Sequence, residues 1–303
     1  MTILAVGSRH SMAYVQETTF GTTPATPVFK ALRHNSTTLA LTKQGFASAE
    51  IRADRQIANY RHGTYQVGGD IVSELSATSF DDLIAAAMMQ TAWTSNALII
   101  GTTQTSFTIE RFFDDIGQYI RSTGCQIDGF SFSVKPNGLI DVTFPVVGLS
   151  ETTASVAITG STYGSLSTTS PMDGFTGIIK NGGTAIATVT QLDLKFTNKL
   201  AAQFAVGNQA AVGITEGTAN VTGQIIAYFT DLSLLDLFIN ETESSLEFTF
   251  TDGTNSYDFL VPNLKYNGSN PDVKDDGPIM LTLPYQSILD TVTGTTLKIT
   301  RTT

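Results

Sequence analysis

The chain has 303 residues, of which 41% are hydrophobic and 15% are charged, and its formal net charge is −10. This composition supports a large buried core and excludes a disordered chain, while the acid excess argues against duplex binding through neutralisation of phosphates. A single cysteine, Cys125, excludes an internal disulfide framework, and no apolar run is long enough for a membrane-spanning helix.

Two helices interrupt a pattern that is otherwise typical of strands. The stretch 79–90, SFDDLIAAAMMQ, combines good helix formers with Ser79 as the expected N-cap and Asp82 three residues later. A weaker helical pattern follows Asp231 in residues 231–240, DLSLLDLFIN. We therefore expect one clear helix in the first half of the chain and a weaker one in the second half.

Paired strands are predicted at four places along the chain. Residues 107–125 favour a strand, a turn near Gly117 and a second strand. Alternating apolar residues flank the turns in the other three stretches, whose turn residues tolerate the positive φ angles of tight hairpins. These hairpins cover residues 130–144, 175–196 and 246–260.

The two halves of the sequence repeat one pattern. Gly69 and Gly223 are 154 residues apart (223 minus 69), as are the helical Leu83 and Leu237, and Pro145 and Pro284 are 139 apart (284 minus 145). Loops between the helix and the last strands can absorb the difference of 15 residues. The strands 27–32 and 175–180 match as the first strands of the two copies. We predict two tandem units, residues 1–150 and 151–303, the second beginning with the Ser/Thr/Gly-rich segment 151–171.

Catalytic and metal-binding patterns are missing from the sequence. It has no GxSxG, P-loop, HExxH or CxxC motif, and the three histidines lack metal-ligand spacing. The acidic stretch 270–277 has no regular calcium-ligand ladder. We predict no enzymatic activity, no cofactor and no metal. The alternative function is a β-sandwich adhesin that binds carbohydrate through Trp93 and the nine tyrosines.

Several segments together resemble the major tail tube proteins of long-tailed, non-contractile (siphovirus-like) bacteriophages. They are YVQETTFGTTPATP (14–27), GTYQVGGDI (63–71), the helix that follows, and the strands beginning FTIERFF (107–113). The resemblance spans nearly the whole chain. It implies a mainly β fold of two β-barrel or sandwich units, each with a long hairpin loop and one flanking α-helix. It also implies a structural role in stacked rings that form the hollow conduit for viral DNA.

The resemblance also implies partners and a location. Six chains form a ring in relatives with one unit per chain, so a duplicated unit predicts trimeric, pseudo-hexameric rings, with hexameric rings as the alternative. Further implied partners are tape-measure, tail terminator and baseplate proteins, while double-stranded DNA passes through the lumen without specific binding. The protein would fold in the bacterial cytoplasm and then reside in the virion tail, without contacting a membrane.

In such a tube, residues 43–64 would form a loop that reaches the adjacent ring. Arginine suits this contact because its planar fork can hold a carboxylate through two bonds. Each exposed ion pair contributes only about 0–1 kcal/mol, so apolar side chains should supply most of the affinity. The other possibility is a solvated hairpin whose charges keep an exposed edge soluble. The predicted inter-ring residues are Lys43, Arg52, Arg55, Arg61, Ile51, Ile57 and Tyr60.

The acid excess would also suit a DNA conduit, because a negative lining repels phosphates weakly and leaves no sticking points. The phase of the strands cannot be read well enough to choose the lining residues. The visible concentrations of carboxylates are Asp114 with Asp115, and Asp272 with Asp275 and Asp276.

Overall fold

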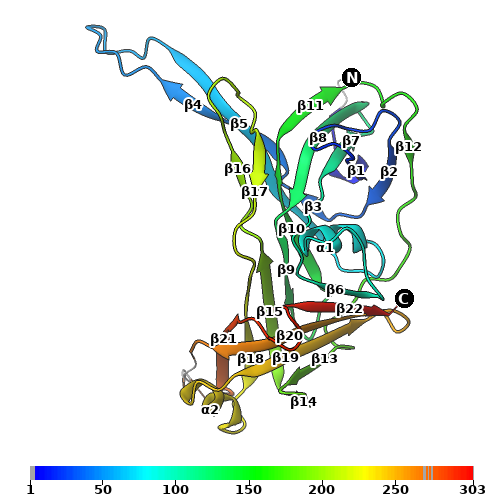
Figure 1. The fold of residues 1–303 in the computed structure, drawn as a ribbon, viewed down its shortest axis with the longest axis vertical. Coiled ribbons are helices and arrows are strands. Elements are labelled where there is room, and N and C mark those ends of the chain that lie inside the picture. The colour runs from blue at the N-terminus through cyan, green and yellow to red at the C-terminus, as the bar shows by residue number, and fades with distance from the viewer. Residues whose placement is uncertain (1–3, 269–270, 272, 274–275, 303) are drawn as a thin grey trace.

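The computed structural model describes residues 4–268, 271, 273 and 276–302. It is mainly β, as predicted, and its described part contains two short α-helices, α1 (Asp81–Ala87) and α2 (Ser233–Ile239). Figure 1 shows the first half of the chain beside the N-terminus and the second half beneath it, with one long hairpin projecting from the body. The sheets are open, and no described sheet closes on itself as a barrel.

The first half begins with a short 3-10 helix (Gly7–Arg9) and continues with strands. These are β1 (His10–Gln16), β2 (Val28–Leu32), β3 (Ser36–Thr37), β4 (Ala40–Ala47), β5 (Tyr60–Glu74), β6 (Ala97–Ile99), β7 (Phe107–Phe113), β8 (Gln118–Ile127), β9 (Gly129–Val134) and β10 (Asp141–Gly148). The next two strands are β11 (Ser150–Ala154) and β12 (Thr162–Tyr163).

The second half contains strands on both sides of α2. These are β13 (Ile178–Asn181), β14 (Thr184–Ala185), β15 (Val189–Thr197), β16 (Ala201–Gln203), β17 (Gly213–Thr215), β18 (Asn220–Tyr228), β19 (Ser244–Thr251), β20 (Ser256–Tyr266), β21 (Met280–Ser287) and β22 (Lys298–Thr302).

One antiparallel sheet runs through both halves. Its strands pair in the order β4, β5, β10, β9, β15, β18 and β21. β9 is the joint, because it pairs with β10 on one edge and with β15 on the other. At the end of the sheet, β4 pairs with no described strand other than β5.

A second layer in each half is built around a hairpin. In the first half the order is β2, β1, β7, β8 and β11, and in the second it is β14, β13, β19, β20 and β22. β13 pairs with β19 as β1 pairs with β7. The predicted match between the strands 27–32 and 175–180 is therefore wrong, since β1 and not β2 occupies the position of β13.

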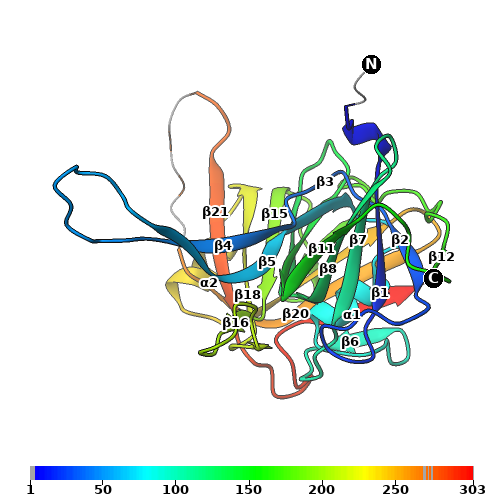
Figure 2. The same ribbon diagram turned by 90° about the horizontal axis from the view of Figure 1, so that it is seen from above.

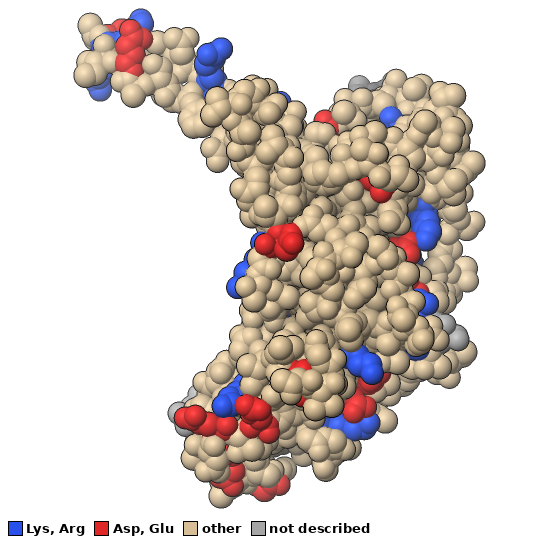
Figure 3. Space-filling model, in the orientation of Figure 1, with Lys and Arg blue, Asp and Glu red and all other residues tan. Residues whose placement is uncertain are grey.

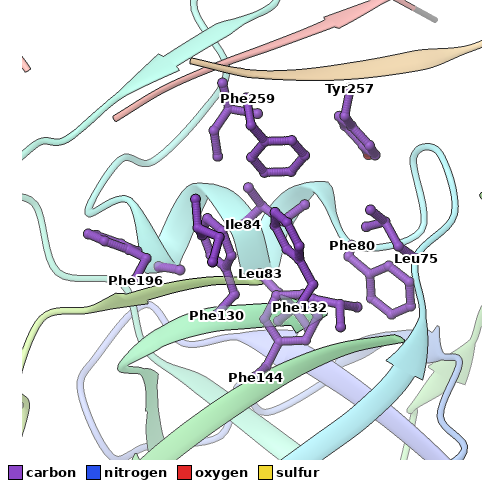
Figure 4. Packing of buried hydrophobic residues seen from close by; sticks show 14 of the residues in the cluster. Leu75, Phe80, Leu83, Ile84, Phe130, Phe132, Phe144, Phe196, Tyr257 and Phe259 are labelled. Atoms are coloured by element: carbon purple, nitrogen blue, oxygen red, sulfur yellow. The ribbon is translucent and has the colours of Figure 1, made fainter. Parts of the chain in front are cut away.

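The core lies between these layers and contains α1. Buried aromatic side chains from β9 and β20 pack against each other, with the ring centroids of Phe132 and Phe259 5.1 Å apart. Figure 4 shows α1 beside this cluster, which Tyr257 and Phe259 enter from one side and Phe130 and Phe132 from the other. The alternation of apolar residues predicted from the sequence thus produces one core shared by the two halves.

Most local predictions are confirmed, with two corrections. The hairpins β7–β8, β9–β10 and β19–β20 form as expected. In the stretch 175–196, however, only β13 and β14 form a hairpin, because β15 pairs with β9 and β18 instead. Ser79 does not cap α1: the N-cap residue is Phe80, and the Ser79 hydroxyl bonds to Ser76 and to the Ala77 carbonyl.

The segment 151–171 lies along the first half of the chain. β11 pairs with β8, and β12 pairs in parallel with β2. Further along, the Thr169 carbonyl accepts a hydrogen bond of 2.7 Å from Arg33. The segment is therefore bound to the first half of the chain at several points.

Candidate functional site

The long hairpin of β4 and β5, called the arm here, carries all of the predicted inter-ring residues. It projects from the body in both views, and residues 48–59 form its tip (Figures 1 and 2). Two aromatic rings cover glycines of the opposite strand: a Cβ at Gly45 would lie 1.7 Å from the Tyr60 hydroxyl oxygen, and one at Gly63 would lie 2.2 Å from the Phe46 ring. Ring-on-glycine packing thus supports a two-stranded ribbon that has no core of its own.

The cations of the arm differ in their surroundings. Arg52 forms an ion pair of 2.9 Å with Asp54 inside the tip, and this guanidinium lowers the pKa of the Asp54 carboxyl. Arg55 has a positive φ of 61° in the turn, where its amide donates to the Arg52 carbonyl. Lys43 lies 5.8 Å from the centroid of the Tyr65 ring. Within the described residues no ion pair forms at Lys43, Arg55 or Arg61, so these charges remain open to an external partner.

Apolar side chains gather at the same tip. Ile51 is fully exposed, and Ile57, Tyr60 and Phe46 are largely exposed. A ribbon that holds so many large apolar side chains in water is typical of a contact surface. The structure therefore brings the predicted cations and apolar residues together at one projecting end.

A second long hairpin has a different arrangement. It rises from β15 and β18 and carries β16 and β17, and its end lies against the base of the arm. There the Tyr65 amide donates a hydrogen bond of 2.8 Å to the Gln209 carbonyl. Its two charged residues are Lys199 and Glu216, and Glu216 accepts a hydrogen bond from Gln104. The first arm is thus free and charged, whereas the second is docked on its neighbour.

The continuous sheet turns one polar face away from the core. Along β15, Leu192 and Leu194 are buried, while Asp193 and the other alternate side chains point to the opposite side. Asp193 accepts hydrogen bonds from Gln191 (2.9 Å) and Gln224 (2.7 Å). We call this surface the polar face; it includes Asp70, Ser131, Ser133, Asp141, Thr143, Asp193, Lys195, Thr222, Gln224 and Thr282. Carboxylates outnumber cations on it.

Two of the carboxylates singled out in the sequence, Asp114 and Asp115, do not lie on this face. Asp114 pairs with Arg9 at 2.5 Å, and Asp115 accepts a hydrogen bond of 2.6 Å from the Val6 amide, both at the turn between β7 and β8. Asp272 and Asp275 lie outside the described residues, whereas Asp276 is described. Sequence reasoning missed Asp70, Asp141 and Asp193, although their alternation with buried neighbours was a usable signal.

Trp93 takes part in the junction between the two halves. Its indole nitrogen donates to the Asp81 carbonyl at 3.1 Å, and the Arg301 guanidinium lies 4.5 Å from the centroid of its rings. The Asp81 carboxylate in turn accepts a hydrogen bond of 2.6 Å from the Tyr257 hydroxyl and forms an ion pair with Arg301. This network, which we call the junction lock, connects α1 to β20 and β22. Trp93 is therefore used for cohesion within the chain.

Two of the three histidines form a pair. Nδ1 of His10 and Nε2 of His34 are 2.7 Å apart, and Arg111 lies beside them. Burial, reinforced by the charges of His34 and Arg111, lowers the pKa of His10 to about 4, and burial also lowers the pKa of His34. Within the described residues there is no group of three or more His, Cys, Asp or Glu side chains that could hold a metal ion. No helix in the described part is long and apolar enough to cross a membrane.

Comparison with known proteins agrees with the resemblance seen in the sequence. The family model described as phage tail tube protein matches residues 7–287. A comparison with curated proteins found no similar sequence. A tail tube is a stacked oligomeric assembly of the virion tail, which fits a chain with an open sheet and a projecting arm. The chain belongs to the phage tail tube protein family and is a structural subunit of the tail tube.

Proposed function

We propose that the chain is a tandem tail tube subunit of a siphovirus-like phage, with units at residues 1–150 and 151–303. Three chains form a pseudo-hexameric ring, and stacked rings form the hollow conduit for viral DNA. The observation that carries this proposal is the seam between β9 and β15, where two similar units join edge to edge within one chain. Rings of six chains are the alternative.

The strand registers support the tandem arrangement. Gly69 lies opposite Val146 in the β5–β10 pair, and Gly223 lies opposite Tyr285 in the β18–β21 pair. These partners are separated by the same 154 and 139 residues as the sequence repeat. Both glycines also face a carbonyl so closely that a Cβ would collide with it, 2.5 Å from the Thr38 oxygen in one case and 2.0 Å from the Asp193 oxygen in the other. One packing constraint thus accounts for glycine at both positions.

A matching irregularity gives independent support. In the β7–β8 hairpin, Phe107 pairs with Cys125 and Ile109 with Ser122, so β8 contains one extra residue. In the β19–β20 hairpin, Ser244 pairs with Leu264 and Leu246 with Val261, so β20 contains the same extra residue. A bulge at equivalent places in two hairpins favours duplication over chance similarity.

The free edge of β4 supports ring formation. Its counterpart, β15, has β18 on one edge and β9 on the other. β4 has only β5 among the described strands, so its outer row of N–H and C=O groups is open to pairing. In the proposed ring, the second unit of a neighbouring chain pairs with the free edge of β4. This contact would correspond to the one inside the chain, where β9 of the first unit pairs with β15.

The arm and the polar face would then have separate tasks. The arm bridges rings: its tip contacts the adjacent ring through Ile51, Ile57 and Tyr60, while the open cations Arg55 and Arg61 face carboxylates there. Lys43 and Arg52 lie on the same surface. The polar face lines the lumen, where its excess of carboxylates lets DNA slide. Tape-measure, terminator and baseplate proteins are the further partners, and folding precedes assembly in the bacterial cytoplasm.

Electron cryomicroscopy of tubes assembled from the purified protein tests this proposal. The expected map contains three chains per ring, with β4 of each chain paired to the next chain and the arm reaching the adjacent ring. Six chains per ring would overturn the trimer, and an unpaired β4 edge in an assembled ring would overturn the seam argument.

A further inference from the structure

The two helices occupy equivalent positions but are covered to different extents. All five residues from Leu83 to Ala87 of α1 are buried, whereas no residue of α2 is. Ile239, near the end of α2, is 61% exposed, and Leu232, at its N-cap, is also exposed. Each helix packs on its own unit, α1 near β8 and α2 near β20. The difference therefore arises on the other side of the helix.

The second half of the chain supplies the cover of α1. The end of the β19–β20 hairpin extends past its own unit and places Tyr257 and Phe259 against α1 (Figure 4). The Tyr257 hydroxyl accepts a hydrogen bond from the Thr78 amide and donates one to Asp81. One unit thus covers the helix of the preceding unit with the end of its hairpin.

The first half carries the counterpart of this covering surface. The pair Arg111–Ile120 in β7–β8 occupies the position of the pair Phe248–Phe259 in β19–β20, two residues from the bulge on the same side. The same end of the hairpin presents Phe113 and Gln118. We call these four residues, Arg111, Phe113, Gln118 and Ile120, the hairpin face. Gln118 is exposed and the other three are partly exposed.

We propose that α2 of one chain docks on the hairpin face of a neighbouring copy of the same chain. This inference rests on the proposed ring of tandem units and identifies the helix contact that completes each seam between chains. The occupant is a second copy because the internal contact of α1 with the β19–β20 hairpin already uses the equivalent surfaces. Continuation of that contact around the ring covers both exposed surfaces at once.

Charge also favours this pairing. The segment around α2 carries Asp231, Asp236, Glu241 and Glu243 and has no lysine or arginine between residues 228 and 246. Figure 3 shows acidic side chains gathered at the end of the molecule where α2 lies. On the hairpin face, the half-buried Arg111 donates its hydrogen bonds to the Leu39 carbonyl and His10 rather than to a carboxylate. An acidic helix therefore meets a guanidinium whose hydrogen-bond partners among the described residues include no carboxylate.

The helix contact inside the chain and the proposed contact between chains nevertheless differ in chemistry. The position of Asp81 in the repeat is occupied by Leu235, and that of Tyr257 by Gln118. The hydrogen bond that joins Asp81 to Tyr257 inside the chain cannot form between chains. The contact between chains therefore depends on apolar packing and on the attraction between Arg111 and the acidic helix, and the two helices are not interchangeable.

Cross-linking of two introduced cysteines tests the docking. The variant Leu235→Cys with Gln118→Cys is assembled and treated with a short bifunctional maleimide, and the products are separated under denaturing conditions. The native Cys125 is fully buried and should not react. We expect a ladder that ends at three chains. The control variant, Leu289→Cys with Gln118→Cys, should give no ladder.

The outcomes separate this inference from the proposed ring. A ladder that ends at six chains would overturn the trimer and keep the docking. Intact tubes without cross-links, or equal cross-linking of the control, would overturn the docking and keep the ring. Because the cysteine variant could fail to assemble, a second comparison uses Ile239→Asp and Leu289→Asp, whose side chains are 61% and 60% exposed in the single chain. We expect Ile239→Asp to raise the concentration needed for assembly about tenfold, which corresponds to about 1.4 kcal/mol. Equal assembly of the two variants would overturn the docking.

Discussion

Replacement of Asp81 by alanine should weaken the connection between the two halves of the chain. The Asp81 and Arg301 side chains are only 15% and 20% exposed, and the Tyr257 hydroxyl is buried. Loss of the carboxylate leaves a guanidinium and a hydroxyl without their acceptor. Removing one partner of a fully buried ion pair costs about 3–5 kcal/mol, and partial access of water places the expected loss near the lower limit, at about 3 kcal/mol.

Urea unfolding of the monomer measures this loss at protein concentrations too low for assembly. The matched control is Asp114→Ala, which breaks the exposed ion pair with Arg9 and should cost no more than about 1 kcal/mol. The free energy of unfolding should therefore fall clearly more for Asp81→Ala than for the control. Equal losses in the two variants would show that the junction lock does not hold the halves together.

Three other perturbations address the arm, the polar face and the histidine pair. Arg55→Ala with Arg61→Ala should leave monomer stability unchanged, because both side chains lie on the projecting arm, and should reduce the number of tubes seen by negative-stain microscopy. Asp193→Lys should leave tubes intact but cause them to retain duplex DNA, measured by co-sedimentation at physiological salt. The lowered pKa of His10, about 4, means that the folded state holds this ring neutral while the unfolded chain takes up a proton near pH 6.5. Its contribution to stability is therefore complete above pH 6.5 and is lost as the pH falls toward 4. Allowing for solvent screening, we expect a loss of about 1–2 kcal/mol, which His10→Phe should remove from the pH dependence of the melting temperature.

For each of these three predictions, one experimental result would contradict it. Unchanged tube yield would show that the open cations of the arm do not bridge rings, and Lys199→Ala on the docked hairpin serves as the control. Equal DNA retention by Asp193→Lys and wild-type tubes would remove Asp193 from the lumen. For the histidine pair, His62→Gln on the arm is the control, and a His10→Phe protein with the same pH dependence as this control would contradict the assignment.

Local patterns predicted individual elements well. The alternation of residues 130–144 and 246–260 places apolar side chains on one side of each strand, so both hairpins follow from the sequence. The start of α1 was predicted less well, because Ser79 bonds to Ser76 and the Ala77 carbonyl instead of the free helical amides. These neighbouring partners, which precede the helix, compete with its free amides for the Ser79 hydroxyl.

Contacts between distant segments were beyond reach of the sequence. The pairing of β9 with β15 joins residues about 60 positions apart, and both strands have the same alternation as many others. The density of carboxylates along the sequence was also a misleading guide to the polar face, because strand pairing decides which side chains share a face. Asp114 and Asp115 stand together in the sequence yet bond to the N-terminal segment, whereas the dispersed Asp70, Asp141 and Asp193 share one face.

The seam of β9 and β15 also changes the kinetics of assembly. Because both strands belong to one polypeptide, this seam closes as the chain folds, and its formation does not depend on how many subunits have accumulated. The tether gives the two edges a high effective concentration for each other, whereas seams between chains must wait for a collision. In the proposed tandem arrangement, a covalent duplication would supply some seams before assembly begins, and cellular protein abundance would control only the formation of the remaining seams.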